Sequence, residues 1–93
     1  MSIVANGVIG PRQAQFLDVV LQSGHTYAIY VHPDDPSVDF DLHVFDENGV
    51  LVNWDESPAA DAFCGITPAW TGPFRLVVDA KRGMSPYRVE VQD

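Results

Sequence analysis

Residues 39–55 read DFDLHVFDENGVLVNWD, and their pattern is the strongest indication of the fold class of the chain. Polar and apolar residues alternate on both sides of Asn48-Gly49, as they do in β-strands that bury one face. Asn-Gly is the strongest short signal for a hairpin, because a type I′ turn needs positive φ at both central residues. We therefore predict a β-hairpin whose turn is Asn48-Gly49.

The first strand of this hairpin separates its side chains by character. Apolar residues occupy one face, and acids with one histidine occupy the other. We expect the apolar face to lie in the core and the acidic row to lie in solvent. The apolar residues are Phe40, Leu42 and Val44, and the polar residues are Asp39, Asp41 and His43.

The rest of the chain shows the same period of two between turn signals, and no window keeps a helical apolar period. We predict an all-β fold, an antiparallel β-sandwich of jelly-roll type with about seven to eight strands. Residues 1–93 should form a single domain, with residues 1–13 as an N-terminal lead-in segment that Gly10-Pro11 interrupts. The expected inward residues outside the hairpin are Leu17, Val19, Leu21, Tyr27, Ile29, Val31, Ala62, Cys64, Ile66, Phe74, Leu76, Val78, Tyr87, Val89 and Val91.

The net charge of −8 is unevenly distributed along the sequence. Nine of the thirteen acids lie between Asp34 and Asp61, and no Lys or Arg occurs between Gln13 and Phe74. Such a field repels phosphate backbones, so we expect no nucleic-acid partner. It attracts Ca²⁺ or a basic protein surface, although acidic loops also serve solubility alone.

Cys64 is the only cysteine, so the chain has no internal disulfide, and we expect it to be a small core residue. The N-terminal residues lack the basic and apolar regions of a signal peptide. No segment approaches the ~20 apolar residues of a membrane span. We expect a monomer without a membrane span.

Four segments in register resemble the pre-peptidase C-terminal domains of bacterial proteins. Residues 39–49 are similar to that family's D-x-D-L hairpin, and residues 24–29 (GHTYAI) to its G-x-x-Y-x-I strand. Residues 72–78 and 85–91 resemble its last two strands, with Phe74 in place of the usual Tyr. The resemblance implies a jelly-roll-like sandwich attached to a secreted or cell-surface enzyme, and relatives include collagen-binding modules that bind Ca²⁺. Because no signal peptide is visible, an intracellular location stays open.

A calcium site needs six to eight oxygen ligands, mostly carboxylates and carbonyls. Asp39 and Asp41 share a face, but residues two apart on a strand are separated by roughly 6.5 Å. One ion therefore needs further donors from a loop that folds over them, and a bracing role for Asp41 competes with metal binding. The predicted metal ligands are Asp39, Asp41, Asp55, Glu56 and Asp61, and the predicted cofactor is Ca²⁺.

Exposed aromatic residues form the second candidate site. Aromatic side chains offer large contact areas at low entropic cost, so a group of them suits partner recognition, although each also suits core packing. The predicted binding surface consists of Tyr30, Phe45, Trp54, Phe63 and Trp70.

Catalysis has little support in the sequence. The histidines lack a metal-ligand spacing, and no serine lies in a nucleophile-elbow context. We therefore expect no enzyme but a non-catalytic accessory domain of an exported bacterial protein, which binds, targets or stabilises an attached enzyme. The partner is then a host enzyme domain or an extracellular protein or polymer. The alternative is a free-standing acidic inhibitor or regulatory protein that binds a basic protein surface.

Overall fold

The computed structural model describes residues 2–93, with side chains from residue 5 onward. Met1, the first residue of the expected lead-in segment, lies outside the described residues. No helix long and apolar enough to cross a membrane occurs within the described residues. The eight strands are β1 (Ser2–Ile9), β2 (Ala14–Leu21), β3 (Tyr27–Pro33), β4 (Asp39–Phe45), β5 (Leu51–Asp55), β6 (Ala62–Ile66), β7 (Gly72–Arg82) and β8 (Ser85–Gln92).

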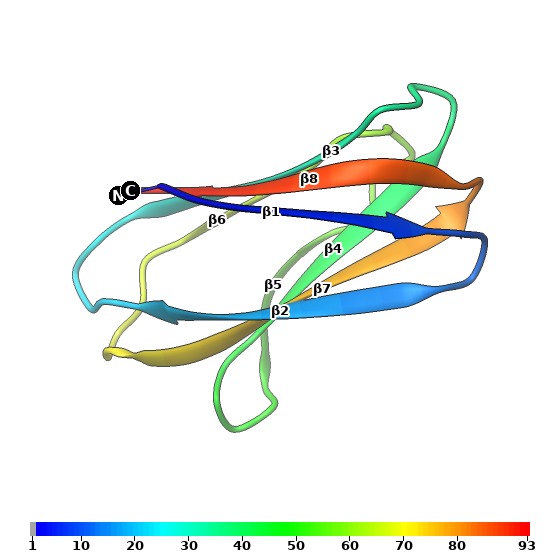
Figure 1. Ribbon diagram of the computed structural model, residues 1–93. Coiled ribbons are helices and arrows are strands. Elements are labelled where there is room, and N and C mark those ends of the chain that lie inside the picture. The colour runs from blue at the N-terminus through cyan, green and yellow to red at the C-terminus, as the bar shows by residue number, and fades with distance from the viewer. Residues whose placement is uncertain (1) are drawn as a thin grey trace.

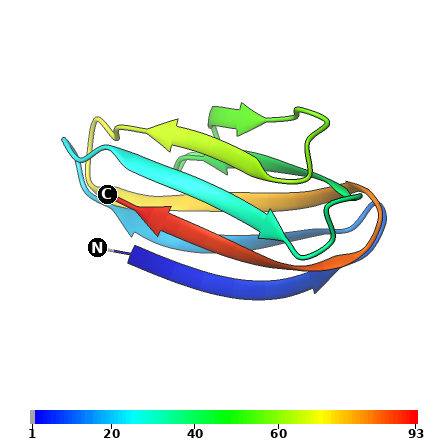
Figure 2. The same cartoon turned by 90° about the horizontal axis from the view of Figure 1, so that it is seen from above.

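The strands form two stacked antiparallel sheets of four strands each, in the orders β1-β8-β3-β6 and β2-β7-β4-β5 (Figures 1 and 2). The hairpin of β4 and β5 is the one connection between consecutive described strands that stays within a sheet. Every other connection crosses from one sheet to the other. Such crossings are typical of jelly-roll sandwiches. The predicted all-β antiparallel sandwich is confirmed.

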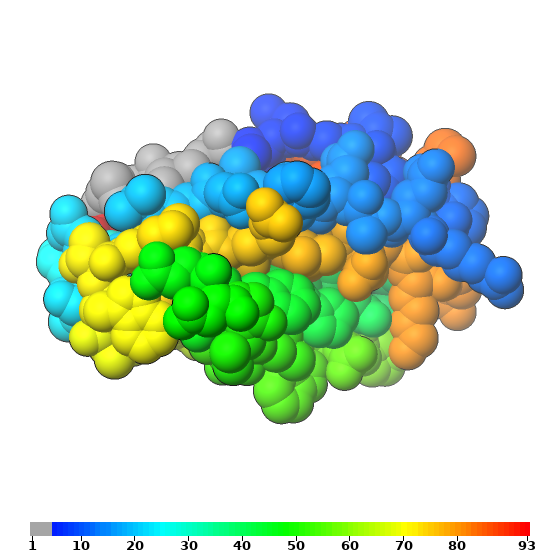
Figure 3. Space-filling view, turned by 90° about the horizontal axis from the view of Figure 1, so that it is seen from below, coloured from blue at the N-terminus to red at the C-terminus, as the bar shows by residue number. Residues whose placement is uncertain are grey.

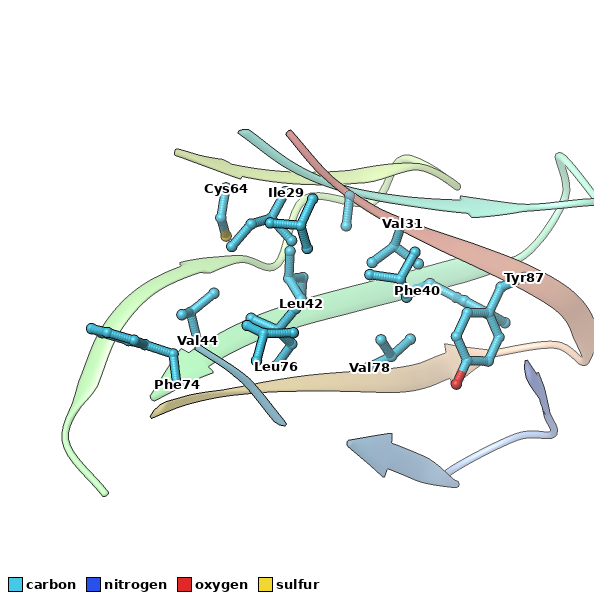
Figure 4. Packing of buried hydrophobic residues seen from close by; sticks show 14 of the residues in the cluster. Ile29, Val31, Phe40, Leu42, Val44, Cys64, Phe74, Leu76, Val78 and Tyr87 are labelled. Carbon is cyan, nitrogen blue, oxygen red and sulfur yellow. The ribbon is translucent and has the colours of Figure 1, made fainter. Parts of the chain in front are cut away.

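Inward-facing residues of both sheets interdigitate to form one core (Figure 4). Ile29, Val31 and Cys64 reach it from one sheet, and Leu42 and Leu76 reach it from the other. The alternation in the sequence predicted this core. Of the residues outside the hairpin that we expected to point inward, all but two are buried. The exceptions, Leu17 and Ile66, are partly buried against the core.

The lead-in segment contributes a strand to the first sheet. Residues 2–9 pair with β8 in antiparallel register, and the strand stops before Pro11. Gly7 lets this strand approach closely, because a Cβ there would lie 2.6 Å from the Tyr87 hydroxyl and the Gln15 side-chain oxygen. Tyr87 of β8 donates a hydrogen bond to Gln15 of β2, so this contact joins the two sheets beside β1.

The hairpin turn differs from the predicted type I′ turn. Gly49 has a φ of 78°, but Asn48 is not among the residues with positive φ. The turn is instead centred on Glu47 and Asn48, with the Gly49 amide donating to the Asp46 carbonyl at 3.1 Å. Asp46 decides this geometry, since its carboxylate accepts from the amides of Asn48 (2.9 Å) and Val50 (3.0 Å).

Candidate functional site

The sheet β2-β7-β4-β5 turns a bare outer face to solvent (Figure 3). Phe16, Val20 and Trp54 are 62%, 60% and 53% exposed on it. Phe16 and Val20 lie outward because their neighbours on β2, Leu17 and Val19, pack into the core. We call this surface the outer face.

Strand register brings the outer-face residues into rows. Phe16 of β2 lies opposite Val77 of β7, and His43 of β4 lies opposite Val77 on one side and Trp54 on the other. Phe16, Val77, His43 and Trp54 therefore cross all four strands in one row. Residues distant in the sequence become neighbours on a rigid sheet.

An ion pair is built into the outer face beside Phe16. The Arg75 guanidinium donates to the two carboxylate oxygens of Asp18 at 2.8 and 3.1 Å and lies 4.0 Å from the centre of the Phe16 ring. The hydrogen bond from Arg75 holds the pKa of Asp18 below its ordinary value. Both side chains are about half exposed, so the pair orients the ring more than it stabilises the fold.

An open hollow of about 500 Å³ lies on the outer face between β7 and the turn of the β4–β5 hairpin. Phe45, Pro73 and Val77 supply apolar lining. Three acids, Asp18, Asp46 and Glu47, and one cation, Arg75, supply its charges. Phe45 shares this face with Arg75, its cross-strand partner. We call this feature the hairpin hollow.

The predicted solvent-facing acidic row is wrong in its exposure. Asp39 and Asp41 are only 9% and 5% exposed, and one carboxylate oxygen of each is buried without a hydrogen-bond partner. Alternation places Asp41 on the outward side of β4, but this end of the strand is covered. The cover is not a strand, since β5 pairs only with the residues from Leu42 to Phe45. Long neighbours such as Glu56 and Lys81 line the same hollow as Asp41 and cover a short acid.

Charges around Asp41 explain its titration. Burial raises the pKa of Asp41, and the nearby carboxylate of Asp39 raises it further. His43 lies beside them, with Nδ1 3.3 Å from Asp79 and Nε2 3.4 Å from Glu56. His43 therefore lies between Asp79 of β7 and Glu56 of the loop after β5, with Asp41 nearby.

The five predicted metal ligands do not converge on one point. The Asp55 carboxylate accepts from the amides of Ser57 and Phe63, both at 2.9 Å, and so braces the loop before β6. Asp61 lies 3.1 Å from Nδ1 of His32 on the other sheet. No group of three or more His, Cys, Asp or Glu side chains in the described part of the chain is arranged to hold a metal ion.

The five predicted aromatic residues divide between separate surfaces. Phe45 and Trp54 lie on the outer face, whereas Tyr30 and Phe63 pair on the opposite sheet with ring centres 5.1 Å apart. Trp70 lies in the loop before β7 and stacks on the buried Phe74 of that strand, with ring centres 6.3 Å apart. One continuous aromatic patch does not form.

Sequence reasoning did not single out Phe16, Val20 or Glu47 as site residues. The signal was present, because the alternation that points Leu17, Val19 and Leu21 inward points Phe16 and Val20 outward. Cys64 is a core residue as predicted, and burial raises its thiol pKa to about 12, with Asp55 adding to the effect. A thiol in that state is not a nucleophile.

Comparison with solved structures adds to this geometry. The pre-peptidase C-terminal domain of a collagenase from Bacillus anthracis has a TM-score of 0.80 at 14% identity, covering 99% of this chain and 90% of that one. The chain has the fold of a pre-peptidase C-terminal domain. The resemblance read from the sequence is confirmed at this level.

A second solved structure shares the fold. It is PliG of Aeromonas hydrophila, a periplasmic inhibitor of g-type lysozyme, with a TM-score of 0.69 at 13% identity over 98% of this chain and 84% of that one. No family model and no curated protein sequence matches the chain. The two neighbours are a domain of an enzyme and an inhibitor of one, and at these identities they establish the fold alone.

Proposed function

We propose that this chain is a non-catalytic binding module that recognises a protein partner through the outer face. The observation that carries the proposal is the exposure of Phe16, Val20 and Trp54 on one face of a rigid sheet. Large apolar side chains held by strands lose little conformational entropy on binding, so they suit the centre of an interface.

The collagenase neighbour supports a role as an accessory domain of an exported bacterial protein. Such a domain binds or targets, or it stabilises the enzyme to which it is attached. In either case, the outer face is the surface that a partner protein or the host enzyme covers.

A second role is favoured by the charge together with the inhibitor neighbour. PliG is a periplasmic inhibitor of g-type lysozyme, and this chain carries a net charge of −8. An acidic inhibitor or regulatory protein uses such a field to engage a basic surface. The accessory role and the inhibitor role both require a protein-binding surface. They differ in which protein binds there.

The test is binding to two purified probes, fibrillar collagen and a g-type lysozyme, with matched variants. Val20→Ser should weaken binding by about fivefold or more, because a buried apolar contact is lost. Val8→Ser is the control, since Val8 is 58% exposed on the other sheet against 60% for Val20. Collagen binding favours the accessory role, and lysozyme binding favours the inhibitor role.

Phe63→Ala decides between the two aromatic surfaces. Phe63 is 50% exposed on the sheet opposite Trp54, which is 53% exposed. Trp54→Ala should weaken binding and Phe63→Ala should not. The reverse result would contradict the outer face as the recognition surface.

Calcium binding is a separate proposal. The buried oxygens of Asp39 and Asp41 that lack hydrogen-bond partners support it, because a cation would satisfy them. The residues fit only in part, since Asp55 and Asp61 are engaged elsewhere. Asp41, with Asp39 and Glu56 nearby, would hold the ion, which would neutralise the charge that the fold concentrates there.

A further inference from the structure

We propose that the hairpin hollow binds an arginine side chain presented by the partner protein. This inference deepens the proposed function and rests on it, since the hollow belongs to the outer face. It names the chemistry of one contact: a guanidinium group between an aromatic ring and a free carboxylate.

Existing contacts leave one carboxylate of the hollow available. Asp18 is engaged by Arg75, and the Asp46 carboxylate accepts two backbone amides of the turn. Glu47 is exposed and has no hydrogen bond or ion pair with any described residue. A cation can therefore pair with the Glu47 carboxylate without breaking an existing hydrogen bond or ion pair.

The apolar lining suits the rest of an arginine side chain. Phe45, Pro73 and Val77 line the hollow, and the half-buried ring of Phe45 offers a surface on which a guanidinium stacks. The methylene stem of arginine packs against apolar surface while its head stays polar. A hollow of about 500 Å³ accommodates such a side chain.

An aromatic ring, a carboxylate and a guanidinium already meet in this way at β2 on this face. Arg75 lies over Phe16 at 4.0 Å and is held by Asp18, two residues further along the strand. Phe45 and Glu47 have the same spacing of an aromatic residue and an acid, without a guanidinium between them. Arg75 cannot serve both pairs, because Asp18 holds its guanidinium at the β2 side.

The charge of the whole molecule favours a basic occupant over a second copy of the chain. Two copies would each bring a net charge of −8 to the contact. Repulsion between like charges of that size opposes self-association through an acidic hollow. A basic partner is attracted by the same field.

The probe is a capped Gly-Arg-Gly tripeptide, compared with the same tripeptide containing citrulline, the neutral isostere of arginine. In an NMR titration of ¹⁵N-labelled protein, the arginine peptide should shift the amide resonances of Glu47, Gly49 and Val77. The citrulline peptide should leave these resonances unchanged. Equal shifts with both peptides, or no shifts at this site with arginine, would overturn the proposal.

Two charge-matched variants locate the contact. Glu47→Gln should weaken the arginine peptide about two- to fivefold, the size expected for an exposed ion pair. Asp61→Asn removes the same charge from the loop before β6, where Asp61 contacts His32 of the other sheet. This variant should leave binding unchanged. Equal weakening by both variants would reduce the effect to net charge and overturn the site.

The outcome is separable from the fate of the proposed function. If the peptide binds at Glu47 but Val20→Ser and Trp54→Ala leave partner binding intact, the hollow stands and the outer face fails as an interface. If those variants weaken the partner while the peptide shows no site, the outer face stands and the arginine contact is wrong.

Discussion

At the scale of single residues, Asp41 is the group whose environment conflicts with its charge. It is 5% exposed, lies near Asp39 and has an unpartnered oxygen. Its pKa is raised above the ordinary value of 3.8 by burial first and by Asp39 second. Deprotonation therefore opposes folding. The stability that protonated Asp41 contributes is complete below pH 3.8 and is lost as the pH rises through the folded-state pKa.

Asp41→Asn should accordingly stabilise the fold at pH 7 in EDTA, by about 1 kcal/mol, because it removes a buried charge and adds donors. Urea unfolding at pH 7 and at pH 3.5 measures the effect. The gain should shrink at the lower pH, where the wild-type carboxyl is mostly protonated in both states. Destabilisation at pH 7 would show that the ionised carboxylate is needed in the fold.

Calcium gives the same residue a second, opposite test. If Asp41 is a ligand, millimolar Ca²⁺ should raise the melting temperature of the wild-type chain, and Asp41→Asn should lose that rise. At a hundredfold excess over Kd the stabilisation is about 2.7 kcal/mol. Mg²⁺ is the control, because it demands nearly ideal octahedral coordination, which the carboxylates around Asp41 are poorly placed to provide. An equal Ca²⁺ response in both proteins would remove Asp41 from the site.

At the scale of elements, Asp55 joins the end of β5 to the start of β6. Burial by itself would raise the pKa of Asp55, but the amides of Ser57 and Phe63 outweigh it and lower the pKa below the ordinary value. The stabilisation is therefore present above pH 3.8 and is lost as the pH falls through the folded-state pKa.

Asp55→Ala should reduce the free energy of unfolding at pH 7 by about 1 to 3 kcal/mol, because it leaves charge-assisted hydrogen bonds unmade. Asp61→Ala at the other end of the same loop is the control. Its side chain is 64% exposed, so we expect a change within about 0.5 kcal/mol. Unfolding curves of the two variants compare them directly, and equal losses would mean that Asp55 does not brace the loop.

At the scale of the whole molecule, the charge of −8 governs how partners approach. For a g-type lysozyme of basic isoelectric point, the association rate constant should fall about tenfold between low and physiological salt. The dissociation rate constant should change little, because the contacts of Phe16, Val20 and Trp54 are apolar. Stopped-flow or surface-plasmon kinetics across a salt series tests this. A salt-independent association rate would contradict electrostatic recognition.

The alternation in the sequence was enough to predict the class of the fold and the composition of the core. Alternation is a local property, since successive side chains of a strand point to opposite faces. It therefore identified Leu42, Val44, Leu76 and Val89 as core residues, all of which are buried. The hairpin of residues 39–55 was predicted for the same reason, and only its turn type was wrong, because Asp46 binds the turn amides.

Which strands are neighbours became known from the folded structure. Because the hairpin is the one consecutive pair that shares a sheet, chain order does not indicate that β2 borders β7 or that Phe16 joins the row of Trp54. The tertiary structure also buries Asp39 and Asp41, which alternation alone placed in solvent, because distant residues such as Glu56 and Lys81 gather around Asp41. It also sends Tyr30 and Phe63 to the opposite sheet. The side of a strand to which a side chain points follows from the local period of two residues. The exposure of that side chain and the geometry of a site depend on contacts between segments that are distant in the sequence.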